Sequence, residues 1–207
     1  MKKTSFILFV GMLLFCSAAS AQFILGVEGS YLTSATGDQK NSNWGGGIQA
    51  KGKISNMVAI GGTLRTYFKN YHDYNTSSYS VQQADQTTQL AGLFEVYFGE
   101  KVQPFIGTDV GMYFTNTVVK SNASSTQSID LKRNKTYFGV GPKAGFQVNT
   151  GSVSPFSQAQ YHVLFGGGED IEVPGFNDVV RTHDKFWTFD IGLLFQIGKV
   201  ADKKSSE

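Results

Sequence analysis

Charged residues recur inside segments that are otherwise apolar, and they are the residues whose side chains are the clearest candidates for chemistry. Nine of them alternate with apolar neighbours, five basic and four acidic: Glu28, Lys51, Lys53, Arg65, Lys69, Glu95, Asp109, Lys143 and Asp190. Successive side chains of a strand point to opposite faces, so all nine share the face opposite the apolar one. Buried charges need partners. We therefore predict a charge network, with Arg65 and Glu95 as expected partners.

The core of this predicted network has seven members: Glu28, Lys51, Arg65, Glu95, Asp109, Lys143 and Asp190. If the face that carries them is enclosed, near balance of charge predicts a cross-linked polar plug. The alternative is a narrow, gated ion path lined by the same residues. The plug is favoured because the eight strands predicted below would form a barrel only wide enough for side chains to fill.

Catalysis is the least favoured reading of the polar residues. The three histidines are His72, His162 and His183, and none has a serine two residues away. A serine nucleophile needs a base within hydrogen-bond reach, and no metal-ligand spacing recurs. We expect no catalytic, cofactor-binding or metal site, and His162 is expected to be a packing residue.

Eight segments carry the alternation and are predicted to be strands. They cover residues 22–32, 43–54, 57–69, 87–98, 104–114, 135–148, 153–165 and 186–198. In the last of them Trp187, Ile191 and Ile197 share a purely apolar face, while Asp190 and Gln196 lie on the other. This strand is expected to close the sheet by pairing with residues 23–31.

The connections alternate between short and long. Short turns lie at 55–56, 99–102 and 149–152, whereas the segments 33–42, 70–86, 116–134 and 166–184 are long and polar. All long connections then lie at one end of the sheet. We predict four long extracellular loops, in which Tyr71, Tyr74 and Tyr79 are candidate contact residues.

The two faces indicate which one meets lipid. Glycines are concentrated on the polar face, as suits a narrow interior, and bulky aromatic residues lie near both strand ends of the apolar face. The predicted fold is all-β: an eight-stranded antiparallel up-and-down transmembrane β-barrel. A soluble β-barrel or sandwich is the competing fold.

Residues 1–21 are predicted to be a cleaved signal peptide. Lys2 and Lys3 precede an apolar run, and Ala19-Ser20-Ala21 fits a signal-peptidase site. The barrel is assigned to 22–198 and a polar C-terminal tail to 199–207. Without the leader, 16 basic and 16 acidic residues balance and no cysteine remains. This composition argues against nucleic acid as a partner and against disulfides.

The stretches FILGVEGSY, PFIGTDVGMY, YFGVGPKAGF and the final FQIG resemble the small eight-stranded outer-membrane β-barrels, the OmpA/OmpX-like porin family. The resemblance implies location in the outer membrane, with membrane lipid and the barrel-insertion machinery as partners. The composition of the long loops, with tyrosines among serine, asparagine and threonine, favours a structural or surface-interaction role with a possible extracellular ligand. A narrow porin-like channel is the alternative, and a lipid-modifying enzyme is less favoured. The family commonly ends on an aromatic residue, whereas here Phe195 is followed by a polar tail.

Overall fold

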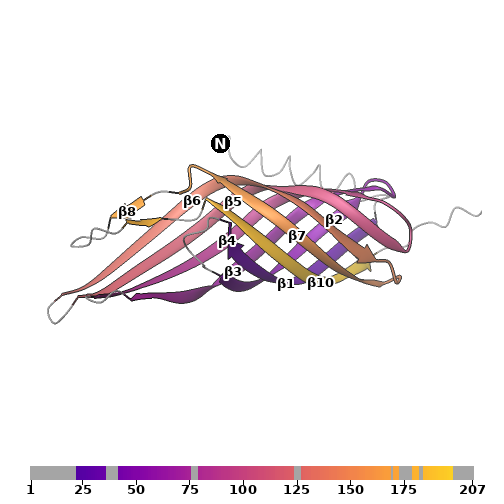
Figure 1. The fold of residues 1–207 in the computed structure, drawn as a ribbon. Coiled ribbons are helices and arrows are strands. Elements are labelled where there is room, and N and C mark those ends of the chain that lie inside the picture. The colour runs from indigo at the N-terminus through magenta and orange to yellow at the C-terminus, as the bar shows by residue number, and fades with distance from the viewer. Residues whose placement is uncertain are drawn as a thin grey trace, which may run out of the picture.

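The fold is taken from a computed structural model, which describes residues 22–35, 42–75, 79–123, 127–168, 170–172, 179–181 and 184–197. The proposed signal peptide and C-terminal tail lie outside these residues. Eight long antiparallel strands close into a barrel (Figure 1). They are β1 (Gln22–Ser34), β2 (Ser42–Lys53), β3 (Val58–Asn75), β4 (Tyr79–Tyr97), β5 (Val102–Ala123), β6 (Gln127–Val148), β7 (Val153–Phe165) and β10 (Lys185–Ile197). Two short strands, β8 (Asp170–Glu172) and β9 (Val179–Arg181), pair with each other.

The barrel is closed by its first and last strands. Phe23 lies opposite Ile197, and the antiparallel ladder continues to Ser34 opposite Phe186. Each of the other barrel strands pairs with its sequence neighbours, as in an up-and-down barrel. Both the eight-stranded fold and the predicted closure by the last strand are confirmed. Among the described residues, no helix is long and apolar enough to cross a membrane.

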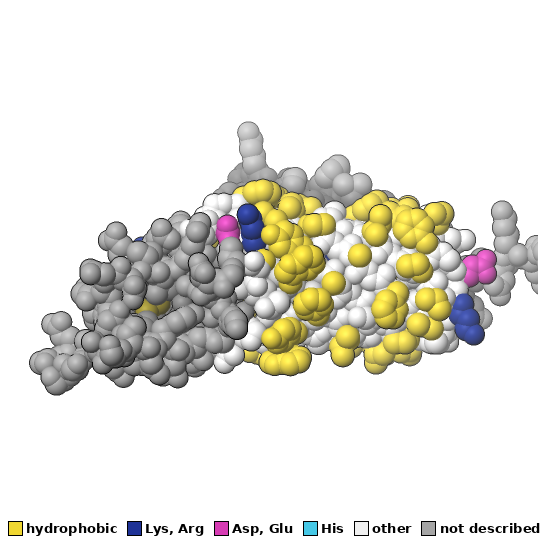
Figure 2. All heavy atoms as spheres, viewed as in Figure 1, with side chains coloured by type: hydrophobic (Ala, Val, Ile, Leu, Met, Phe, Trp, Pro, Cys, Tyr) yellow, Lys and Arg dark blue, Asp and Glu magenta, His cyan; other side chains and the backbone are white. Residues whose placement is uncertain are grey.

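The alternation of the sequence is an alternation of exposure in the structure. Along β10 the side chains of Trp187, Ile191 and Ile197 are exposed, whereas Thr188 and Asp190 are fully buried. Hydrophobic side chains cover the outer wall, with charged side chains of this face only near its two ends (Figure 2). The ten residue steps from Trp187 to Ile197 span about 33 Å along the strand, or about 25 Å when tilted by 40–45°. That height matches the apolar band of a membrane barrel.

The prediction of a long loop is wrong for two of the four segments. Residues 70–75 and 79–86 belong to β3 and β4, and residues 116–123 and 127–134 belong to β5 and β6. In these segments the neighbouring residues Val118 and Val119 are both buried, so the alternation that marks the membrane strands is lost although the backbone pairing continues. The four extended strands project from one end of the barrel (Figure 1).

Lys69 also departs from its expected place. The register of β3 against β4 shifts between Tyr67 and Asn70. Lys69 is exposed, whereas Arg65 and Tyr67 before it are fully buried. A bulge of this kind interrupts the alternation of faces, so Lys69 does not join the buried charges.

Candidate functional site

Arg65 is the centre of the barrel interior. Its side chain comes from β3, is fully buried and donates from Nε to Glu28 Oε1 of β1. Its Nη1 lies 2.9 Å from Asp109 Oδ2 of β5, and its Nη2 lies 3.8 Å from Asp190 Oδ2 of β10. Nη1 also donates to Gln160 Oε1 of β7 at 2.7 Å. Nη1 donates as well to Gln89 Oε1 of β4 at 3.3 Å, so one guanidinium contacts side chains from five other strands.

A second group of charges lies nearer the short turns. Lys143 Nζ of β6 lies 2.7 Å from Glu95 Oε1 and 2.8 Å from Asp109 Oδ1. Lys51 Nζ of β2 lies 2.7 Å from Glu95 Oε2 and donates to Tyr97 Oη at 2.8 Å. Asp109 contacts both Arg65 and Lys143, so it joins the two groups. The structure thus brings all seven sequence-predicted residues together.

The expected pair of Arg65 with Glu95 is wrong. In the β3–β4 ladder Arg65 lies opposite Gln89, and Glu95 lies opposite Ala59. Their backbone positions are six residues apart along the strands, which is about 20 Å. Glu95 pairs with Lys51 and Lys143 instead.

Glycines make the observed ion pairs possible. Gly47 of β2 lies between Arg65 and Glu28 in the ladders, and Gly107 of β5 lies between Lys143 and Glu95. A Cβ on Gly47 would lie 2.6 Å from Arg65 Cγ and 2.9 Å from Glu28 Oε1. Charges two strands apart therefore meet across a residue without a side chain. For these two ion pairs, the glycine between the partners is a signal that the sequence carries.

Asp190 is the carboxylate with the weakest compensation. Its Oδ2 accepts from Gln158 Nε2 at 2.8 Å, and only one cation, Arg65, approaches it among the described residues. Its Oδ1 has no hydrogen-bond partner in the same part of the chain. We therefore expect removal of this charge to be tolerated better than removal of Arg65.

An aromatic layer closes the interior on the side of the extended strands, and sequence reasoning missed it. The layer comprises Leu32, Tyr67, Tyr113, Tyr137, Leu164 and Phe186. The buried His162 ring stacks on Phe186 with centroids 4.5 Å apart, and its two nitrogens contact Tyr113 Oη at 2.9 Å and Thr188 Oγ1 at 3.1 Å. These contacts give His162 a packing role. The available signal was the presence of tyrosines on the polar face near the strand ends.

Apolar residues also line the interior at the short-turn end. Ile24, Phe156 and Leu194 form one buried cluster, and Ala59, Tyr97 and Phe105 form another. The Lys53 ammonium lies 5.0 Å from the Tyr97 ring centroid, at the edge of this layer. The charged layer is thus enclosed by apolar side chains on both sides.

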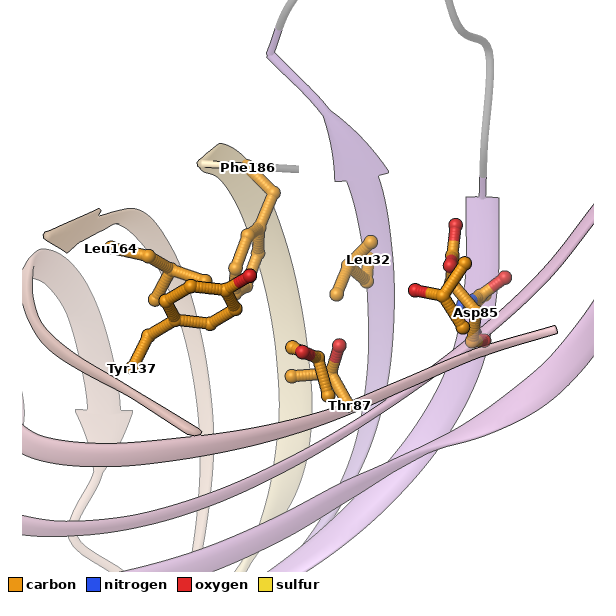
Figure 3. Close-up of a pocket in the computed structure, with 9 residues that line it drawn as sticks. Leu32, Asp85, Thr87, Tyr137, Leu164 and Phe186 are labelled. Carbon is orange, nitrogen blue, oxygen red and sulfur yellow. Dashed lines mark hydrogen bonds between the residues drawn. The ribbon is translucent and has the colours of Figure 1, made fainter. Parts of the chain in front are cut away.

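A small pocket lies above the aromatic layer (Figure 3). Leu32, Tyr137, Leu164 and Phe186 line its apolar side, and Asp85 and Thr87 lie toward the other. Its volume of about 20 Å³ admits a group the size of one water molecule. The floor of this opening is the aromatic layer itself.

Comparisons with known proteins identify solved structures with a similar fold. No family model and no curated protein matches the chain. A major outer membrane protein from Thermus thermophilus is 12% identical and has a TM-score of 0.57 over 86% of this chain and 100% of its own. Neisserial surface protein A is 13% identical, with a TM-score of 0.51 over 84% of this chain and 97% of its own.

OprG, an outer membrane protein of Pseudomonas aeruginosa, is 14% identical and has a TM-score of 0.50 over 87% of this chain and 97% of its own. At sequence identities this low, the similarity concerns the fold alone. The exposed apolar wall and this fold agree with the location in the outer membrane that the sequence indicates. The chain therefore has the fold of the small bacterial outer-membrane β-barrels.

Proposed function

We propose that this protein is a non-enzymatic outer-membrane barrel with a plugged interior, and that it acts at the cell surface through its projecting strands. The observation that carries the proposal is the contrast between the two regions. The interior is filled by ion pairs between two apolar layers. On the strands that leave the barrel, in contrast, the basic residues Lys132, Arg133 and Lys135 are exposed.

The filled interior argues against a channel. Arg65, Asp109 and Lys143 form a continuous set of contacts across the lumen. Their side chains are fully buried, as is Tyr113 in the layer above. An ion crossing the barrel has to separate buried pairs, and breaking such a pair costs about 3–5 kcal/mol.

The projecting part is a four-stranded sheet, here called the blade: residues 70–75 of β3, 79–86 of β4, 116–123 of β5 and 127–137 of β6. Its ladders continue to Asn75 opposite Ser80 and to Ala123 opposite Gln127. The pairing of β3 with β2 ends at Tyr67, and that of β6 with β7 ends at Phe138. Within the described residues, the blade therefore has two edges without a neighbouring strand.

The β6 edge carries basic side chains, and their charge determines which kind of strand can pair with it. Lys132, Arg133 and Lys135 are exposed on it. A free strand edge pairs with an added strand through backbone hydrogen bonds. Pairing with a second copy of this edge places like charges opposite each other, which is destabilising. Pairing with a strand that carries acidic side chains places unlike charges opposite each other, which is stabilising. We therefore propose an extended acidic polypeptide as the ligand.

The test removes the blade at a level where its ladders are aligned. Asn70 pairs with Asp85, Asp85 with Thr117, and Thr117 with Arg133. Deleting residues 71–84 and 118–132, with an Asn-Gly turn at each junction, leaves complete ladders. The readout is binding of the purified protein, in zwitterionic lipid vesicles, to immobilised polyglutamate.

We expect the trimmed variant to keep its heat-modifiable gel mobility and to lose at least about tenfold in binding. The control for charge is the full-length triple variant Lys132→Gln, Arg133→Gln and Lys135→Gln, which keeps the blade. It is expected to bind weakly as well. Unchanged binding by the trimmed variant, or no binding by the wild type, contradicts the proposal.

A further inference from the structure

The point at which β7 ends depends on two glycines. β7 pairs with β6 up to Phe165, opposite Phe138, and is followed by Gly166, Gly167 and Gly168. Gly166 has φ of 78° and Gly168 has φ of 76°, in the left-handed region, and these turns end the strand. Glycine adopts extended backbone as readily as this conformation. The same residues therefore permit β7 to continue along β6.

Continuation of β7 in its existing register matches opposite charges. Since Phe165 lies opposite Phe138, Asp170 comes opposite Arg133 and Ile171 opposite Lys132. Asp170 is then also a diagonal neighbour of Lys135, and Glu172 is a diagonal neighbour of Arg133. Opposite and diagonal cross-strand pairs of unlike charge stabilise a sheet. The basic edge of the blade thus has a complementary strand within its own chain.

Chain length allows this arrangement. Glu172 is seven residues beyond Phe165, so an extended β7 places it about 23 Å farther along the blade. The twelve residues 173–184 reach up to about 40 Å, enough to return to Lys185 at the start of β10. In the present structure Asp170–Glu172 forms β8 instead, and its ladder with β9 has only three residue pairs.

We propose that the segment Asp170–Glu172 exchanges between the β8–β9 hairpin and an extension of β7 that covers the basic edge of β6. In the extended state the backbone edge of Lys132–Lys135 is paired from within the chain. An acidic ligand then has to displace this strand, which makes the segment autoinhibitory. The inhibitory consequence rests on the proposed function, whereas the strand exchange itself does not.

Disulfide trapping tests the exchange without any ligand. Ile171→Cys with Lys132→Cys places two thiols opposite each other only in the extended state, at a separation that a disulfide spans. The matched control is Ile171→Cys with Leu131→Cys, whose second thiol points to the other face. Both are built in residues 22–207, which contain no cysteine.

Under mild oxidation of the full-length protein in lipid vesicles, we expect the 171–132 pair to cross-link at least about tenfold faster than the 171–131 pair. Equal rates, or no cross-link in the first pair, overturn the proposal. The cross-linked protein is expected to bind polyglutamate more weakly than the same variant after reduction, a comparison in which both forms lack the Lys132 charge. If the cross-link forms and binding is unchanged, the exchange stands and the autoinhibition is wrong.

A second set of variants leaves every charge in place. Gly166→Val with Gly168→Val disfavours the left-handed conformation, because a β-branched residue is strained at positive φ. Gly167→Val is the control, since this glycine is not in that region. We expect the double variant to slow hydrogen exchange of alternate backbone amides in residues 131–137 by about tenfold or more relative to the control. Identical exchange in the two proteins contradicts the strand extension.

Discussion

Replacing Arg65 by Met is the perturbation to which the interior is expected to respond most strongly. The side chain is fully buried, and Arg65 contacts the three carboxylates of Glu28, Asp109 and Asp190. Asp109 keeps Lys143 as a partner after the substitution, but the ion pairs of the described residues leave Glu28 and Asp190 without a cation. Removing one partner of a buried ion pair costs about 3–5 kcal/mol. We expect the free energy of unfolding to fall by that amount.

The assay is reversible urea unfolding in lipid vesicles, followed by gel mobility. Lys53→Met is the matched control, because it removes a half-buried basic residue whose described contacts are Gln103 and the Tyr97 ring. This control is expected to cost less than about 1 kcal/mol. Adding Glu28→Gln and Asp190→Asn to Arg65→Met is expected to restore at least half of the loss. If Arg65→Met stays within about 1 kcal/mol of the wild type, the charge network does not hold the barrel together.

Two further substitutions test the assignment of faces and the packing of the interior. Ile191 is 69% exposed on the outer wall, and its replacement by Lys is expected to impair membrane insertion by about 2–4 kcal/mol. The neighbouring Asp190→Asn is expected to be far milder. Equal effects of the two substitutions in a folding assay contradict the assigned faces. Gly47→Ala is expected to lower the free energy of unfolding by about 1–3 kcal/mol, because the new Cβ overlaps Arg65 Cγ. Gly29→Ala is the control, since its Cβ meets nothing within 4 Å, and a similar loss in both variants shows that glycine spacing does not determine the ion pairs.

The sequence predicts the barrel well because a membrane imposes a strict alternation on each strand. Asp190 between Phe189 and Ile191 is enough to orient β10, since a one-residue slip exchanges the two faces. Closure by β1 and β10 follows from the number of strands and the need to pair every backbone group in lipid. These predictions depend on local pattern, which the sequence displays directly.

The partners inside the barrel are harder to predict because they depend on the register between strands. Arg65 and Glu95 lie on neighbouring strands, yet the ladder separates them by six positions. Arg65 instead meets Glu28 across Gly47. The blade is missed for another reason. Outside the membrane no apolar face is needed, so β5 and β6 continue without the alternation that identifies them within it.

Single-protein conductance in a planar bilayer tests the central claim most directly, because a plugged barrel and a narrow channel differ in this one property. With the charged layer enclosed between the aromatic layer and the apolar clusters of the short-turn end, the purified wild-type protein is expected to show no discrete openings above background. Reproducible conductance steps that disappear after heat unfolding would contradict the plugged interior and favour the channel.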